Sequence, residues 1–557
     1  MNNKFKYTVF LLSAVALLSS CKDVNEEKYY GNGGADGTSV SLQASSPVTI
    51  GMETDYAPLN AANYLQTVVA NASQTTFGSA MTHGAIVQAD STLDFSMPDA
   101  QMAAVNAKGL KVWGHALCWY KNQNANFIKT FAGLLPPPNA LAEGNPDFED
   151  WVDNQTVAGW SWANGKDSYG TVLQGTKADD VNHGKSSMTV TIIQTVASIG
   201  SSWHLQLVSP SFISVAGHEY SVSFYAKASV SDCQWQGEWD HNGSPSYTSG
   251  DLTTSWTNYA MKFSGANPKG TGVPTTICFD LAYSPVGAVI YLDNVVIVDE
   301  TQAALDSDPE TQATLLNETF QNWVTGIVSH YKGQVVGWDV VNELFADDGS
   351  IRNNANTTSS SATDWFVWSN YLGKNIGVTA FNLAHEADPN ALLFINESGL
   401  ECNTATSSQK LDSLIAYVQW LKSQGVHIDG IGTSMHVNIA TAKVGVDYMF
   451  RKLAATGLKI RISELDVSVN QFIGTTKSNG FVLTPEVLAD QAVTYHDVIA
   501  SYLQNVPAEQ RQDITIWGVN DPNSWLYNNG QNYPLLFDAN YVTKPAFDGF
   551  LQGLKAQ

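Results

Sequence analysis

Two glutamates stand where β-branched runs of the sequence end, and both are candidates for acid–base chemistry. Residues 335–341 contain four valines and lead into Asn342 and Glu343, and residues 459–463 lead into Glu464. A carboxylate at the end of a buried strand is costly for packing, so its position points to chemistry. A proton-donating carboxyl group paired with a nucleophilic carboxylate is the equipment for cleaving a glycosidic bond. In such a pair the charge of Glu464 would keep Glu343 protonated.

Both glutamates belong to a repeating pattern of short apolar strands and amphipathic helices. We expect strands over residues 48–52, 76–81, 110–117, 335–342, 391–396, 428–436, 459–464 and 514–520. The alternation of strands and helices predicts a parallel sheet. Eight such strands predict an α/β fold, a (β/α)8 TIM barrel, in which chemistry gathers at the C-terminal ends of the strands.

The pattern is interrupted after the third strand. Prolines occupy 136–138, and from about 145 to 299 the sequence alternates Thr, Ser, Val and Tyr with polar residues. Short strands with little helical periodicity predict an all-β sandwich inserted in the barrel. We therefore expect the barrel over 47–138 and 305–557, and the insert over 139–304.

The first 21 residues have the pattern of a signal peptide, with Lys4 and Lys6 before an apolar run that ends near Cys21. Leu18-Ser19-Ser20-Cys21 resembles the bacterial lipoprotein box, which implies that Cys21 carries the lipid anchor in the membrane. Residues 22–46 are rich in Gly, Ser, Asn and acids and are expected to form a flexible tether. The acidic start of this tether resembles signals for the outer face of an outer membrane, so we expect a cell-surface location.

Charge and cysteine content exclude other classes of function. With 28 Lys and Arg against 52 Asp and Glu, the formal net charge is −24, which leaves no basic face for nucleic acid. Cys118, Cys233, Cys278 and Cys402 lack the spacing of a zinc site or of a disulfide scaffold. A Cys233–Cys278 pair within the insert stays open.

The motifs around the two glutamates resemble those of glycoside hydrolase family 10, the endo-β-1,4-xylanases. Trp338-Asp339-Val340-Val341-Asn342-Glu343 is similar to the acid/base motif, and Ile462-Ser463-Glu464-Leu465-Asp466 to the nucleophile motif. Similar motifs also occur at Gly114–Trp119, Gly430–His436, Trp517–Trp525, Pro534–Asp538 and Lys544–Ala546. The resemblance implies retaining endo-hydrolysis of xylan without a cofactor.

The same resemblance implies a role for each matching residue. Glu343 would be the acid/base and Glu464 the nucleophile, with Asn342 binding the sugar 2-hydroxyl. The remaining expected site residues are His436, which orients Glu464 with Asp466 behind it, and His115, Trp119 and Trp525, which line the subsite beside the cleaved bond. Asp339 is expected to be a buried structural partner.

Four places in the sequence depart from the family pattern. The Glu-Asn and Lys expected after the second strand are replaced by the stretch Thr82–Val87, and Tyr120, Ser398-Gly399 and Ser434 replace His, Tyr-Asn and Gln. The replaced residues after the second strand normally contact sugars on the non-reducing side of the cleaved bond. We expect altered binding there, with tolerance of decorated chains.

The insert resembles a carbohydrate-binding module of the family 4/22 type, through Asn145–Glu149, Phe224–Ala228 and Tyr291–Val295. Aromatic rings can stack on sugars or form the core of a sandwich. The glycan-binding candidates are Trp160, Trp162, Trp203, Trp235, Trp239 and Tyr247. Modules of this type often hold a structural Ca²⁺, for which Glu149 and Asp293 are the candidate ligands.

Three functions stay open at this point, and we expect a monomer in each case. The first is a retaining endo-β-1,4-xylanase. The second is the same barrel acting on another β-linked glycan, such as mixed-linkage glucan. The third is a non-enzymatic surface protein that binds xylan, which the tryptophan-rich insert favours and the two glutamates oppose.

Overall fold

The computed structural model describes residues 40–135, 137–195, 204–239, 246–263, 273–359, 362–401, 408–470 and 481–556. The predicted signal peptide with Cys21, most of the predicted tether, and Trp203 and Cys402 lie outside these residues. The chain divides into two compact units, of which the second holds Gln88–Ser91 and Asn124–Asn322 and the first the rest. Among the described residues, no helix has both the length and the apolar character needed to cross a membrane.

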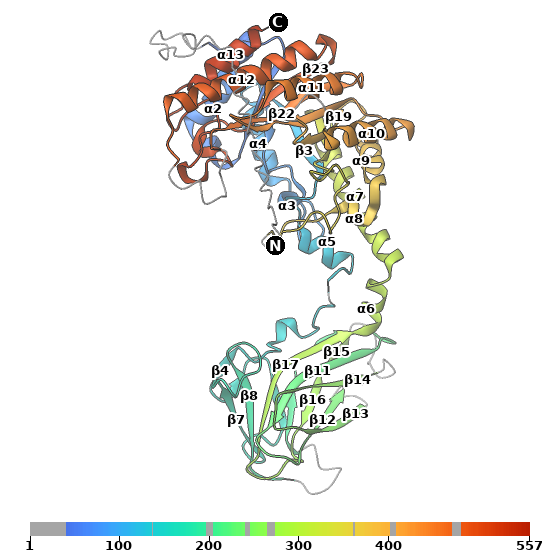
Figure 1. Ribbon diagram of the computed structural model, residues 1–557. Coiled ribbons are helices and arrows are strands. Elements are labelled where there is room, and N and C mark those ends of the chain that lie inside the picture. The colour runs from blue at the N-terminus through green and yellow to red at the C-terminus, as the bar shows by residue number, and fades with distance from the viewer. Residues whose placement is uncertain are drawn as a thin grey trace, which may run out of the picture. The chain divides into compact units, whose positions relative to one another are not determined.

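The first unit contains a closed barrel of eight parallel strands (Figure 1). The strands are β1 (Thr49–Thr54), β2 (Gln74–Phe77), β3 (Lys111–Cys118), β18 (Val335–Asn342), β19 (Leu392–Ser398), β20 (Gly430–Ser434), β22 (Lys459–Ser468) and β23 (Arg511–Ile516). Each pairs with the next in this order, and β23 pairs with β1 to close the ring. The short strand β21 (His436–Asn438) pairs with the end of β22. The predicted (β/α)8 barrel is therefore confirmed.

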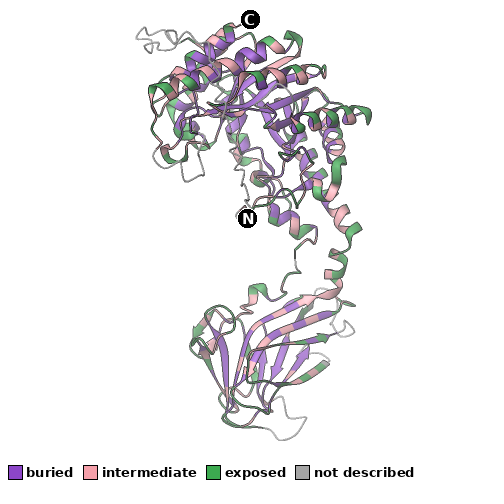
Figure 2. Cartoon of the chain, viewed as in Figure 1, coloured by how far each residue is buried: buried purple, intermediate pink, exposed green. Residues whose placement is uncertain are grey.

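Helices follow the strands, and their buried sides have the spacing expected of amphipathic helices. They include α2 (Ala62–Asn71), α3 (His83–Ile86), α4 (Ser96–Asn106), α7 (Pro309–His330), α9 (Ile376–Ala387), α10 (Gln409–Ser423), α11 (Lys443–Ala454), α12 (Pro485–Asn505) and α13 (Pro545–Lys555). In α11 the buried residues include Val446, Met449, Phe450 and Leu453, which lie on one face. Figure 2 shows the result, with buried strands inside and helices that expose one side to solvent.

Two boundaries differ from the sequence-based expectation, and one helical segment is interrupted. The second strand ends at Phe77, because the residues after it turn into α3. The helical segment between β18 and β19 is divided into α8 (Trp368–Leu372) and α9, since Gly373 adopts φ 64° and ends the first helix. The last residues of the expected tether form the short helix α1 (Leu42–Ser45), in which Leu42 is fully buried.

The second unit contains the insert, which has two five-stranded antiparallel sheets. One sheet has the order β14-β11-β17-β8-β7 and the other β13-β12-β16-β9-β6. The strands are β4 (Trp151–Asp153), β5 (Thr156–Val157), β6 (Ser161–Asn164), β7 (Gly170–Gly175), β8 (Ser187–Ile192), β9 (Gln206–Val208), β10 (Phe212–Ser214), β11 (Tyr220–Ala228), β12 (Cys233–Trp239), β13 (Ser246–Leu252), β14 (Thr257–Phe263), β15 (Val273–Thr275), β16 (Ile277–Asp280) and β17 (Val289–Asp299).

Apolar side chains of both sheets form one core, to which Phe224 and Ile290 contribute from the first sheet and Phe279 from the second. An all-β insert after the third barrel strand is thereby confirmed. Cys233 and Cys278 are both buried free thiols, so the pairing left open above is wrong.

Candidate active site

The backbone at Glu343 is held in an unusual conformation directly after β18. Its φ is 50°, in the left-handed region that residues other than glycine enter at a cost of about 1–3 kcal/mol. The backbone N–H of Glu343 donates to the Asn396 carbonyl at 3.0 Å, and its carbonyl accepts from Arg352 Nε at 2.9 Å. These contacts hold the glutamate at the barrel mouth.

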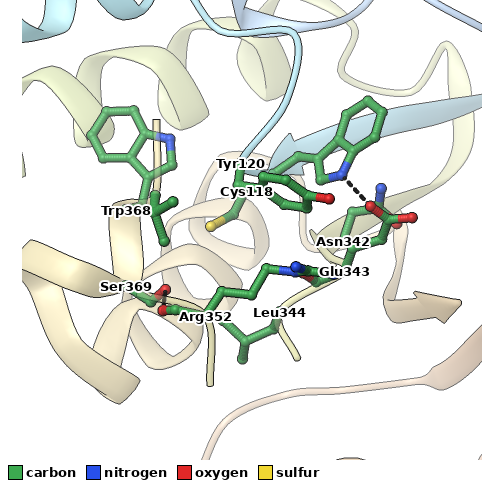
Figure 3. Close-up of a pocket in the computed structure, with 10 residues that line it drawn as sticks. Cys118, Tyr120, Asn342, Glu343, Leu344, Arg352, Trp368 and Ser369 are labelled. Carbon is green, nitrogen blue, oxygen red and sulfur yellow. Dashed lines mark hydrogen bonds between the residues drawn. The ribbon is translucent and has the colours of Figure 1, made fainter. Parts of the chain in front are cut away.

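The side chain of Glu343 has two donors on one oxygen. Oε2 accepts from Trp119 Nε1 at 3.0 Å and from Lys121 Nζ at 3.3 Å, and Figure 3 shows the carboxylate beside the loop that follows β3. Burial raises the pKa of Glu343 and the charge of Glu464 adds to this. Lys121, with smaller contributions from Trp119 and His436, outweighs both and holds the pKa below its ordinary value. The expectation that the charge of Glu464 keeps Glu343 protonated did not include the positive charge of Lys121, which acts in the opposite direction.

Glu464 lies on β22 among donors that stabilise its ionised form. Oε1 accepts from Asn396 Nδ2 and from Ser434 Oγ, both at 2.8 Å, and Oε2 lies 3.2 Å from His436 Nε2. Burial raises the pKa of Glu464, but the hydrogen bonds of His436 and Ser434 and the charges of His115 and His436 lower it to about 2. Glu464 is therefore a carboxylate at ordinary pH, as a nucleophile must be.

His436 bridges Glu464 to Asp466 behind it. Its Nδ1 lies 2.9 Å from Asp466 Oδ2, which also accepts from Trp525 Nε1 at 2.9 Å. Burial lowers the pKa of His436, and the two carboxylates raise it well above its ordinary value. The imidazolium thus donates to both carboxylates. The Trp525 side chain is 63% exposed and so keeps surface for a ligand.

His115 and Asp339 belong to a buried network below the mouth. His115 Nδ1 lies 2.9 Å from Asp339 Oδ2, and Asp339 Oδ1 accepts from Trp113 Nε1 and Arg461 NH1, each at 3.0 Å. Arg461 also contacts Asp513 at 3.2 Å. Asp339 is thus a buried structural partner, as expected, and it fixes the ring of His115.

Asn342 and Trp119 complete the group of expected barrel residues at this end. Asn342 Oδ1 accepts from Asn396 Nδ2 at 2.8 Å, which leaves the Asn342 amide nitrogen available to donate to a ligand. The ring of Trp119 meets that of His115 edge-on at 5.6 Å. Asn396 connects Asn342, Ser434 and Glu464 through one amide, a role that the sequence does not reveal.

The departures from the family pattern have identifiable positions. His83 is buried between the rings of Trp323 and Trp368, at 5.3 and 6.0 Å, and burial lowers its pKa to about 3. Tyr120 packs under the guanidinium of Arg352 at 4.3 Å. Figure 3 shows residues that line a cavity at Glu343, which include Asn342, Cys118, Tyr120, Arg352, Trp368 and Ser369. These residues support the fold around Glu343.

Glu53 is a further carboxyl group at the mouth that sequence reasoning missed. It lies on β1, and its carboxyl group occupies the space that a Cβ at Gly78 would need. Burial, with the charges of Asp55 and Glu464, raises the pKa of Glu53 well above its ordinary value. The glutamate that follows Ile50, Gly51 and Met52 near the end of the first strand was the available signal.

The aromatic candidates of the insert differ in how far they are buried. Trp160, Trp235 and Trp239 are 7%, 4% and 1% exposed and belong to the sandwich core, so their interpretation as a stacking platform is wrong. Because side chains alternate along β12, Trp235 and Trp239 point inward together. Trp162 is partly buried against the same core, whereas Tyr247 is 55% exposed.

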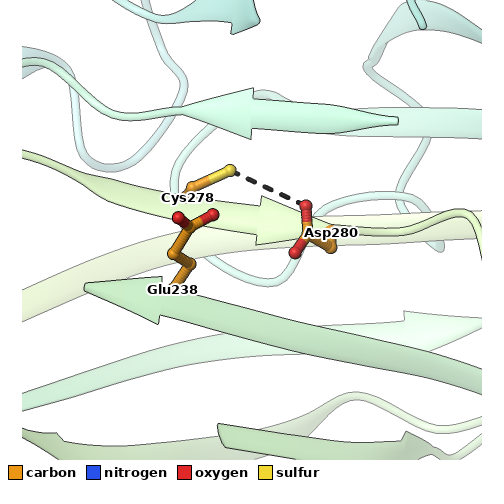
Figure 4. A group of neighbouring side chains, drawn as sticks. All are labelled: Glu238, Cys278 and Asp280. Carbon is orange, nitrogen blue, oxygen red and sulfur yellow. Dashed lines mark hydrogen bonds between the residues drawn. The ribbon is translucent and has the colours of Figure 1, made fainter. Parts of the chain in front are cut away.

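The opposite face of β12 carries a polar group of side chains. In the described part of the chain, one set of three candidate ligand groups lies within 4.8 Å: Glu238, Cys278 and Asp280 (Figure 4). Burial and the neighbouring carboxylates raise the pKa of the Cys278 thiol, which keeps it neutral. Tyr247 is the strand partner of Glu238 on β13. Tyr247 therefore lies on the polar face of this sheet.

The predicted calcium ligands both contact the turn at residues 182–186. Asp293 Oδ2 accepts two backbone N–H groups at 2.9 Å, and Glu149 Oε1 accepts two more, from Lys185 at 2.5 Å and from Ser186 at 2.9 Å. Asp293 Oδ1 is buried and has no hydrogen-bond partner. A buried carboxylate oxygen without a partner fits a cation ligand.

Comparison with known proteins gives a consistent match. The family model described as "Glycosyl hydrolase family 10" matches residues 39–139 and 297–553, on both sides of the insert. Endo-1,4-beta-xylanase A of Cellvibrio japonicus is 35% identical over 254 residues, which are 43% of this chain and 40% of that protein. Endo-1,4-beta-xylanase C of Phanerodontia chrysosporium is 36% identical over 247 residues, or 44% and 55% of the two chains. The matches thus span about half or less of these relatives.

Solved structures share the fold. A GH10 structure from Paenibacillus barcinonensis aligns with a TM-score of 0.54 at 18% identity, covering 93% of this chain and 99% of that one. The catalytic core of a xylanase A aligns with a TM-score of 0.53 at 19% identity, covering 92% and 100%. At these identities the likeness concerns the fold alone.

Proposed function

This chain belongs to glycosyl hydrolase family 10, and we propose that it hydrolyses internal β-1,4-xylosidic bonds of xylan with retention of configuration. The observation that carries the proposal is the state of Glu464, a buried carboxylate held by Asn396, Ser434 and His436 with its pKa lowered to about 2. The names of the relatives support xylan as the substrate.

In the first step, the Glu464 carboxylate attacks C1 of the sugar while the protonated form of Glu343 gives its proton to the leaving oxygen. The C1–O bond to the leaving chain breaks, and a glycosyl ester of Glu464 forms. Asn342, whose Oδ1 is held by Asn396, donates to the 2-hydroxyl as positive charge develops on the ring. Trp525 provides an exposed ring beside the bond.

In the second step, water attacks C1 of the ester and gives a proton to the Glu343 carboxylate. The bond between C1 and Glu464 breaks, and Glu464 leaves as a carboxylate that His436 and Ser434 stabilise. Glu343 is then protonated again for the next cycle. No cofactor takes part in either step.

A substrate panel tests this proposal. We expect reducing-sugar release from xylan and arabinoxylan, no comparable release from mixed-linkage glucan or mannan, and the β-anomer as the first product by proton NMR. Turnover of glucan alone would assign another β-glycan as the substrate. Binding of xylan without turnover would make the protein a surface binding protein.

Recognition on the non-reducing side is proposed to differ from that of typical members. Two observations support this: His83 lies between the rings of Trp323 and Trp368, and the carboxyl group of Glu53 occupies the space that a Cβ at Gly78 would need. The expected result is an arabinoxylan product profile that differs from that of an ordinary family member. Indistinguishable profiles would contradict this part of the proposal.

The insert is proposed to be a glycan-binding module that uses the polar face of the β12 sheet. Tyr247, exposed on β13 as the partner of Glu238, is the ring available there. Tyr247→Ala should weaken binding to soluble xylan by about 2- to 12-fold, since an aromatic contact contributes about 0.5–1.5 kcal/mol. Affinity electrophoresis of full-length protein in the inactive Glu464→Ala background measures this.

The control for this prediction is Leu173→Ala. Leu173 is 40% exposed on β7 of the other sheet. Its substitution should leave xylan binding unchanged. Equal loss in both variants would exclude the β12 sheet as the specific binding face.

A structural Ca²⁺ is proposed at Asp293 Oδ1 and Glu149, supported by the unpartnered buried oxygen. Chelation should lower the melting temperature of the insert, and an unchanged melting curve would argue against the ion.

We also propose that Cys21 is lipidated and that the protein sits on the outer face of the outer membrane. Cys21→Ser should then move it from the membrane fraction to the soluble one.

A further inference from the structure

Lys121 makes a direct ion pair with the proposed acid/base. Its Nζ lies 3.3 Å from Glu343 Oε2, and the two side chains are 35% and 12% exposed. The ammonium also lies 5.5 Å from the ring centre of Trp119 and 5.1 Å from that of Tyr120. Two aromatic rings and a carboxylate therefore hold this cation in place.

The other groups that act on Glu343 come from several elements. The charged or titratable ones are Glu464 on β22, His436 on β21, Glu397 on β19, and Tyr120 and Arg352 in the loops beside it. Arg352 contacts the backbone carbonyl of Glu343, whereas Lys121 contacts the carboxylate. Lys121 is thus the cation placed to act on the proton that Glu343 exchanges.

We propose that Lys121 is a positioning residue that holds Glu343 as a base and so favours the second step of the reaction over the first. The inference rests on the proposed function. In the first step Glu343 must donate a proton, and a cation at 3.3 Å disfavours the form that carries it. In the second step Glu343 must accept a proton from water, and the same cation favours the form required.

This opposite action on the two steps predicts a distinctive set of kinetic changes. The acid form of Glu343 is present below its pKa and is lost as pH rises through it. Lys121 lowers that pKa, so removing the charge raises it and extends the first step to higher pH. The second step then slows, because less of Glu343 is ionised at a given pH.

Lys121→Met tests the proposal, because methionine keeps an unbranched chain between the rings but has no charge. For xylohexaose, whose leaving group needs a proton, the basic limb of the kcat/KM profile should move to higher pH. For an aryl xylobioside with a good leaving group, hydrolysis of the ester limits turnover, so kcat should fall about 3- to 10-fold. A pre-steady-state burst of phenolate should grow as the ester accumulates.

Lys121→Arg is the matched control, since it keeps the charge and should keep the wild-type basic limb. If Lys121→Met lowers all parameters together with an unchanged basic limb, Lys121 has a purely structural role and the inference is overturned. A wild-type enzyme inactive on both substrates would instead refute the proposed function. The two failures are therefore distinguishable.

Discussion

Glu464→Ala should lower kcat on xylan by about 10⁵- to 10⁶-fold, because loss of the nucleophile removes the covalent route. The cavity left by the side chain would be lined by the remaining donors Asn396, Ser434 and His436, and none of these forms the covalent bond to C1. Reducing-sugar release over long incubations measures the residual rate. The melting temperature and the affinity for xylohexaose should stay near those of the wild type, which separates loss of chemistry from loss of folding.

A small anion can take the place of the missing carboxylate and report the stereochemistry. Azide entering the Glu464→Ala cavity would attack C1 from the side of Glu464 and give an α-xylosyl azide, because only one displacement occurs. His436, which is held by Asp466 at 2.9 Å, would stabilise the bound anion. A β-configured azide, or full activity without azide, would contradict the assignment of Glu464.

The barrel was predictable because its signal is periodic and local. Short, largely apolar strands of four to ten residues alternate with amphipathic helices, and all eight expected strands overlap those of the structure. The boundaries were less predictable where a turn competes with the strand, as after Phe77, or where a single residue such as Gly373 ends a helix. These depend on local backbone conformation that a periodic pattern does not encode.

The active-site residues also fall into a group that the sequence predicts and a group that it does not. The residues that define the chemistry stand at strand ends and carry recognisable motifs, as Glu343 and Glu464 do. The residues that tune it become visible only when distant segments meet. Lys121 lies 222 positions from Glu343, and Asn396 lies 68 positions from Glu464. For this reason the expectation that Glu343 is protonated did not include the positive charge of Lys121.

In the insert, tryptophan content alone could not separate core from surface. The alternation along β12 places Trp235 and Trp239 on the face opposite Glu238, and packing against the other sheet covers the face that carries the two tryptophans. Sequence gives this alternation but leaves open which side meets the second sheet. The polar face with Tyr247 therefore emerged only from the structure.

Glu343→Ala should separate the two steps by the leaving group. On xylan, where the departing oxygen needs a proton, kcat/KM should fall about 10²- to 10⁴-fold. On an aryl xylobioside with a good leaving group, kcat/KM should change little, while kcat falls because no base activates water. The measurement is steady-state kinetics on both substrates, with a phenolate burst as the sign of accumulated ester on Glu464.

The Glu343→Ala variant also tests how Glu343 acts together with Glu464 and Lys121. Azide should restore turnover of the aryl substrate and give a β-xylosyl azide, since it attacks the ester formed on Glu464 and so makes the second inversion. The pH dependence assigned to Glu343 should disappear with its carboxyl group. Adding Lys121→Met to Glu343→Ala should then leave the pH profile unchanged, because Lys121 acts through the carboxylate 3.3 Å from its ammonium. A further shift in the double variant would mean that Lys121 acts on another group.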